Sequence, residues 1–99
     1  ELRISQRFVC KMHYTNLRIF GARLRELRKQ KGLSQEGLAE LSGVHRNFIG
    51  FIERGERNVG IRTVIKLAFA LGLTPADLFA GCKFLDEAAP LDHSAEHNP

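Results

Sequence analysis

The chain has 99 residues, 43% of them hydrophobic, and a formal net charge of +4, which favours one small globular domain with flanking arms and excludes a large core. Its longest apolar run, LAFALGL, is far below the ~20 residues of a membrane helix, and its start lacks the pattern of a signal peptide, so we expect a soluble, cytoplasmic protein. Its two cysteines, Cys10 and Cys82, lie far apart, which excludes a disulfide framework and a zinc spacing and predicts free thiols.

The first sixteen residues alternate between apolar and polar side chains. The apolar ones occupy even positions: Leu2, Ile4, Phe8, Cys10, Met12 and Tyr14. A period of two is typical of a β-strand, and a lone strand leaves an unpaired edge. We therefore expect residues 1–16 to form an arm, which is either a possible β-strand that pairs with the same strand of a second subunit or a disordered segment.

Helical spacing begins after this arm. Asn16 is a favourable helix cap, and Phe20, Leu24 and Leu27 then recur on one side of the chain. Gly32 stops the pattern. The spacing predicts a helix over residues 17–31.

Two short helices come next. Ser34 caps the first, Gly43 ends it, and residues 42–44 form a turn. The second begins near His45 and closes at Gly55 after Arg54. Two short helices joined by a turn of three or four residues with a glycine are the signature of a helix-turn-helix.

Two further helices complete the predicted fold. One covers residues 61–71 before Gly72, and the other starts at Thr74 and Pro75, which are favoured as a cap and as a first helical residue. Beyond Gly81 the chain is acidic and polar. We expect an all-α, compact five-helix domain over residues 17–80, followed by an acidic flexible tail over residues 81–99.

The helix over residues 45–54 has two chemically different sides. At about 100° per residue, Phe48, Ile49 and Ile52 share one side. The opposite side carries Arg46, Asn47, Gly50 and Arg54. Arginine can make a bidentate contact to guanine, asparagine can do the same to adenine, and the first turn of a recognition helix reaches deepest into the major groove. The pattern predicts that Arg46 and Asn47 contact bases while the apolar side packs inside.

Two residues of this helix leave alternatives open. Gly50 costs roughly 1 kcal/mol relative to alanine in a helix, so it either allows DNA to approach closely or is simply tolerated. Phe51 lies between the two sides and either packs on a thymine methyl or covers the rim of the core.

The charge is unevenly distributed along the chain. Residues 1–66 hold 14 of the 15 Lys and Arg residues with six acids, whereas residues 67–99 hold one base and five acids. This asymmetry favours a polyanionic partner for the front part, although a solvated basic surface would give the same count.

Two segments, LRELRKQKGLSQEGLAELSGVHRNFIGFIERGERN and LAFALGLTPADLF, resemble the phage-repressor (Cro-type) helix-turn-helix family. The similarity covers about residues 18–80 and includes the LSQEGLA opening, the glycine turn, the IERGERN exit and the ALGLTPADLF joint in order. It implies a five-helix domain that binds two-fold operator DNA as a homodimer and regulates transcription, commonly as a repressor.

The resemblance also implies roles for individual residues. Base contacts fall to Arg46, Asn47 and Phe51. The resemblance implies backbone contacts for Gln35, Arg57 and Asn58. Arg54 joins them because it lies on the outward side, and we expect His45 to cap its helix or face a phosphate. The predicted DNA-backbone contacts are therefore Gln35, His45, Arg54, Arg57 and Asn58. Arg28 and Glu53 match a shielded ion pair, so we expect these two residues to be structural.

The sequence departs from the family pattern at three points. Gly37 replaces a better helix former, residues 59–60 replace a more favourable helix start, and Phe51 replaces a small or polar residue. The base preferences of relatives therefore do not transfer to this chain.

No constellation typical of an enzyme is present, and we predict no cofactor and no metal. The alternative function is an antitoxin or adaptor-type protein-interaction module with the same fold, in which a protein partner attaches to the N-terminal arm or the C-terminal tail.

Overall fold

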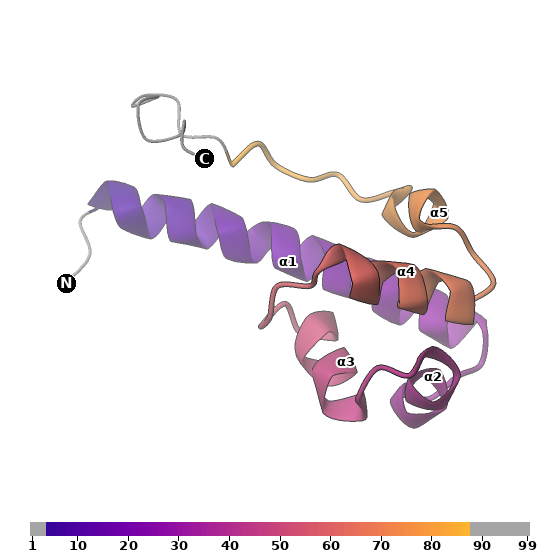
Figure 1. Cartoon of the computed structure of the whole chain (residues 1–99). Helices are drawn as coiled ribbons and strands as arrows, with labels where there is room; N and C mark the ends of the chain where they lie inside the picture. The colour runs from indigo at the N-terminus through magenta and orange to yellow at the C-terminus, as the bar shows by residue number, and fades with distance from the viewer. Residues whose placement is uncertain (1–3, 88–99) are drawn as a thin grey trace.

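The computed structural model describes residues 4–87, with side chains from residue 14 onward. It contains five helices, namely α1 (Ile4–Gln30), α2 (Gln35–Ser42), α3 (Arg46–Glu53), α4 (Ile61–Ala70) and α5 (Pro75–Phe79). Figure 1 shows α1 as one long rod, with the other four helices gathered around its C-terminal half. The predicted all-α, five-helix fold is confirmed.

The possible strand at the N-terminus is wrong wherever the structure describes it, because residues 4–16 belong to the 27-residue helix α1. Ile4, Phe8 and Met12 follow each other at intervals of four, a spacing that fits both a strand and a helix. No glycine or proline interrupts residues 1–20, so nothing ends the helix ahead of the predicted start at residue 17. Residues 1–3 lie outside the described part, and the proposed strand pairing between subunits loses its basis.

The core lies where all five helices meet. Its largest fully buried side chains are Leu24, Leu38, Ile49, Ile52, Leu67, Leu71 and Leu78. They come from α1 to α5 and include the residue that follows α4, so each helix contributes at least one leucine or isoleucine to a single cluster. Leu41 of α2 lies outside this cluster and is 61% exposed. α3 is therefore held by its apolar side, as its pattern predicts.

The ends of α2 and the start of α3 are fixed by local hydrogen bonds and one glycine. Ser34 Oγ accepts a bond from the Gly37 amide at 2.9 Å, which caps α2. Gly43 ends α2 with a φ of +78°, a left-handed conformation that glycine adopts without a steric penalty. His45 Nδ1 accepts a bond from the Asn47 amide at 3.0 Å, so His45 caps α3.

α1 and α3 approach each other at backbone distance. A Cβ added at Gly21 in α1 would overlap the carbonyl oxygen of Ile52 and lie 2.7 Å from that of Glu53. Gly55, which ends α3 with a φ of +73°, lies against α1 in the same way, since a Cβ there would be 2.8 Å from the Cα of Arg18. The absence of side chains at these two positions sets the spacing between the two helices.

Residues 82–87, which we call the C-terminal strap, run beside α1 (Figure 1). The Asn16 amide donates to the Leu85 carbonyl at 2.8 Å and to the Glu87 carboxylate, and its oxygen accepts from the Leu85 amide at 2.7 Å. Phe84 contacts Phe79 edge-on, with ring centres 6.1 Å apart. Asn16 thus anchors the strap rather than capping a helix. The remainder of the predicted tail, residues 88–99, lies outside the described residues.

Candidate nucleic-acid interface

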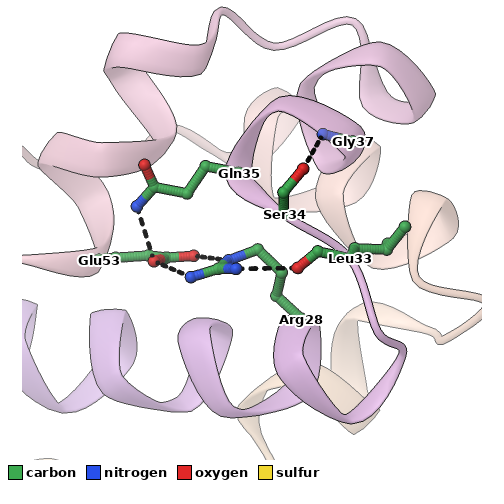
Figure 2. A network of polar contacts seen from close by, with 6 residues as sticks. All are labelled: Arg28, Leu33, Ser34, Gln35, Gly37 and Glu53. Carbon is green, nitrogen blue, oxygen red and sulfur yellow. Dashed lines mark hydrogen bonds and ion pairs between the residues drawn. The ribbon is translucent and has the colours of Figure 1, made fainter.

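A buried polar network connects α1, α2 and α3 (Figure 2). Arg28 of α1 donates to both carboxylate oxygens of Glu53 at the end of α3, from Nε at 2.7 Å and from Nη2 at 2.9 Å. Its Nη1 donates to the Leu33 carbonyl at 2.9 Å. Arg28 and Glu53 are only 7% and 8% exposed. Its hydrogen bonds to Glu53 and the attraction of that carboxylate hold the pKa of the Arg28 guanidinium above its ordinary value, so Arg28 stays charged.

Gln35, the first residue of α2, connects this network to the surface. Its Nε2 donates to Glu53 Oε1 at 3.0 Å (Figure 2). Its side-chain oxygen lies near Gly50 of α3, 3.6 Å from where a Cβ at that glycine would be. One end of the Gln35 amide is therefore fixed by a buried carboxylate, and the side chain is held between α2 and the outward side of α3.

The first turn of α3 presents polar side chains outward. His45, Arg46 and Asn47 are exposed, whereas Ile49 and Ile52 on the other side are 0% and 1% exposed. The Asn47 carboxamide makes no hydrogen bond within residues 14–87, so both its donor and its acceptor are available. An unpaired carboxamide on an exposed first turn is suited to an adenine edge.

Arg46 is engaged within the chain. Its Nη1 lies 2.6 Å from Glu36 Oε2, and the two side chains are 53% and 69% exposed. Ion pairs this exposed contribute about 0–1 kcal/mol, because water screens them and two long side chains must be ordered. The guanidinium can therefore exchange the Glu36 carboxylate for a base edge at small cost.

Gly50 is buried, although the helix pattern placed it on the outward side. The guanidinium of Arg54 lies across it, because a Cβ at this position would be 3.2 Å from Arg54 Nη1. The Gln35 oxygen covers it from the α2 side. Gly50 therefore makes room for the side chains of Arg54 and Gln35. This role differs from both predicted alternatives, which were close approach of DNA and simple tolerance of a glycine.

The exit from α3 combines one aromatic ring with two arginines. The guanidinium carbons of Arg54 and Arg57 lie 5.2 and 4.8 Å from the centre of the Phe51 ring. Arg54 also forms an exposed ion pair with Glu56, at 3.2 Å. Asn58 is exposed, and its side-chain oxygen accepts a bond from the Val59 amide at 2.9 Å.

Most of the predicted contact residues thus come together on one surface, whereas Asn58 lines a separate hollow beside Asn16 and Phe20. A hollow on that surface is lined by Gln35, Arg46, Asn47, Gly50, Phe51 and Arg54. His45 caps the same helix, and Arg57 reaches the Phe51 ring from the following loop. Sequence reasoning missed Glu36, which no pattern in the sequence singled out, and it missed the contacts between Phe51 and the arginines.

Comparisons with known proteins identify the family of the chain. Residues 24–78 match the model of the helix-turn-helix family. The control protein C.SmaI of Serratia marcescens is 53% identical over 53 residues, which cover 54% of this chain and 63% of that protein, just under two thirds of its length. The control protein C.BamHI of Bacillus amyloliquefaciens is 45% identical over 65 residues, which cover 64% of this chain and 80% of the relative.

A solved structure extends the likeness to three dimensions. The restriction-modification controller protein C.AhdI of Aeromonas hydrophila is 55% identical, with a TM-score of 0.65 over 66% of this chain and 98% of that one. In addition, no helix within residues 4–87 is both long enough and apolar enough to cross a membrane.

Proposed function

The chain belongs to the helix-turn-helix family of DNA-binding transcriptional regulators, and from this premise we propose that it binds a two-fold operator as a homodimer and controls the genes of a restriction–modification system. The observation that carries the DNA-binding part is the first turn of α3, where Arg46 and Asn47 are exposed above a fully buried apolar side. The restriction–modification part rests on the similarity to C.AhdI, which is named as a restriction-modification controller.

Two residues read the bases in this proposal. Arg46 leaves Glu36 and binds the O6 and N7 atoms of a guanine, and the free carboxamide of Asn47 binds the N6 and N7 atoms of an adenine. Contacts to phosphates fix the position of α3 in the major groove and come from Gln35, His45, Arg54, Arg57 and Asn58. His45 uses its ring Nδ1 to cap α3, so its other ring nitrogen is the one that faces a phosphate.

The homodimer is supported by an apolar stripe on α4. Ile61, Ile65 and Phe69 are spaced four residues apart and are 68%, 38% and 66% exposed. Large apolar side chains in a row on one helix are typical of a surface that another protein covers. In a two-fold symmetric dimer the α4 stripes of the two copies cover each other. This arrangement brings the two α3 helices to half-sites about 34 Å apart.

The proposed function is tested by selecting bound sites from a random DNA pool and measuring affinity for the selected duplex and for an unrelated one. Arg46→Ala and Asn47→Ala each reduce the preference between the two by about 1 to 3 kcal/mol. Gln35→Ala and Arg57→Ala weaken binding to both duplexes about equally. Arg25→Ala, which removes an exposed charge from α1, is the matched control.

The opposite pattern, with phosphate-contact variants changing the preference and first-turn variants not, would show that α3 is docked differently. Sedimentation of the full chain tests the homodimer, and Phe69→Glu is expected to give monomers with the fold retained. The comparisons do not favour the alternative of an antitoxin or adaptor, and failure to bind any duplex at low salt would revive it.

A further inference from the structure

The end of α3 holds an arrangement that base recognition does not explain. Phe51 is half-buried, and two exposed arginines, Arg54 and Arg57, lie within 5.2 Å of its ring centre. Guanidinium groups at this distance from an aromatic face are attracted by the negative charge distribution of the ring. The ring is therefore already occupied by two cations.

The backbone brings both arginines to the same ring by different routes. Arg54 follows Phe51 by three residues, which places the two on neighbouring positions of the helix surface. Gly55 then reverses the chain with a φ of +73°, and Arg57 returns to the ring from the loop. Gly50 completes the arrangement, because its missing side chain lets the Arg54 guanidinium lie across the helix.

Two guanidinium groups beside one ring repel each other. Their centres cannot be further apart than 10.0 Å, the sum of their distances to the ring. Arg54 has Glu56 as a partner at 3.2 Å, whereas Arg57 has no carboxylate partner among residues 14–87. A pair of neighbouring cations that is only half neutralised is suited to a phosphate group, which arginine binds with parallel N–H bonds.

We propose that Phe51 is a positioning residue, whose ring holds Arg54 and Arg57 in place as a paired contact to the DNA backbone, and that it does not read a base. This proposal rests on the proposed function, because it assigns a ligand of that same surface. It replaces the base contact that the resemblance implied for Phe51.

The test compares Phe51→Leu, which removes the ring but keeps an apolar side chain, with Phe51→Tyr, which keeps the ring. Affinity for the selected operator and for an unrelated duplex is measured between about 50 and 200 mM salt. Each lost phosphate contact lowers the slope of log affinity against log salt by about 0.9. We expect Phe51→Leu to lower the slope by about 0.9 to 1.8 on both duplexes with an unchanged preference, and Phe51→Tyr to behave like the wild type.

A second measurement separates positioning from a change in the fold. Arg57→Ala and Phe51→Leu are combined, and the double variant is expected to lose less slope than the two single variants together, because both remove the same contact. Thermal melting is followed for each variant, and Phe51→Met replaces Phe51→Leu if the leucine variant melts early.

Each other result overturns the proposal. An unchanged salt slope in Phe51→Leu means that the ring positions no phosphate contact, and a changed preference at one base pair means that Phe51 reads a base. Additive losses in the double variant mean that the ring does not act through Arg57. If the wild-type chain itself binds no duplex, the proposed function fails as well, whereas wild-type binding with an unaffected Phe51→Leu removes only the role of Phe51.

Discussion

Replacing Glu53 by alanine tests whether the buried network supports the DNA-binding surface. The change removes three hydrogen bonds, two from Arg28 and one from Gln35, and leaves the guanidinium with only the Leu33 carbonyl at 2.9 Å. Breaking a buried ion pair by removing one partner costs about 3 to 5 kcal/mol. Arg28 keeps one hydrogen bond, and its side chain is 9% exposed to water. We therefore expect a loss of stability at the lower end of this range, about 3 kcal/mol.

For a domain of this size, about 1 kcal/mol shifts the thermal midpoint by about 4–8 °C, so Glu53→Ala should melt roughly 12–24 °C below the wild type. Thermal unfolding followed by circular dichroism and urea titration measure this change. Glu40→Ala, an exposed acid on α2, is the control and should shift the midpoint little. A Glu53→Ala midpoint equal to that of the control would refute the reasoning. A variant with Arg28→Met and Glu53→Leu should recover most of the loss, because no buried charge is left unpaired.

Four further predictions concern single side chains. Gly50→Ala should stabilise the chain by up to about 1 kcal/mol in urea unfolding through helix propensity, yet weaken binding to every duplex, since the added Cβ lies 3.2 Å from a movable guanidinium. Glu36→Gln should bind DNA more tightly, by up to about fivefold, because it frees Arg46 from an exposed ion pair, and equal affinities of variant and wild type would contradict this. The pKa of Asp77 is lowered by a backbone hydrogen bond at the start of α5, so its stabilisation is complete above about pH 4 and is lost on acidification below that; melting scans should show a smaller acid-side decline for Asp77→Asn. Asn16→Ala should speed tryptic cleavage after Lys83 in the strap with little change in melting, and equal cleavage rates would contradict the anchoring role.

The short helices and their joints could be predicted because they depend on local chemistry. Ser34 and Gly43 fix the limits of α2 by a side-chain cap and a left-handed residue, and both signals are readable in the sequence. The long start of α1 could not be predicted from its pattern, since apolar residues four apart satisfy a strand and a helix alike. Only the absence of a breaking residue before Gly21 favoured the helix.

The candidate site was predictable residue by residue but not in its internal contacts. Residues 46 and 47 stand on the outward side because helical geometry alone decides it. The burial of Gly50 depends on where long side chains from two other positions come to rest, and the pair between Glu36 and Arg46 joins helices whose relative placement the sequence does not give. Contacts of this kind follow from tertiary packing, which a helical wheel does not contain.

The network of Arg28, Gln35 and Glu53 has a consequence for protein engineering. Because the partner of the Glu53 carboxylate belongs to α1, a peptide cut to α2, the turn and α3 would carry a buried acid without its base. The DNA-reading pair of helices is therefore not a portable module. A chimera that transplants it onto another scaffold must bring along an arginine at the equivalent place, or exchange both members for apolar side chains of similar volume.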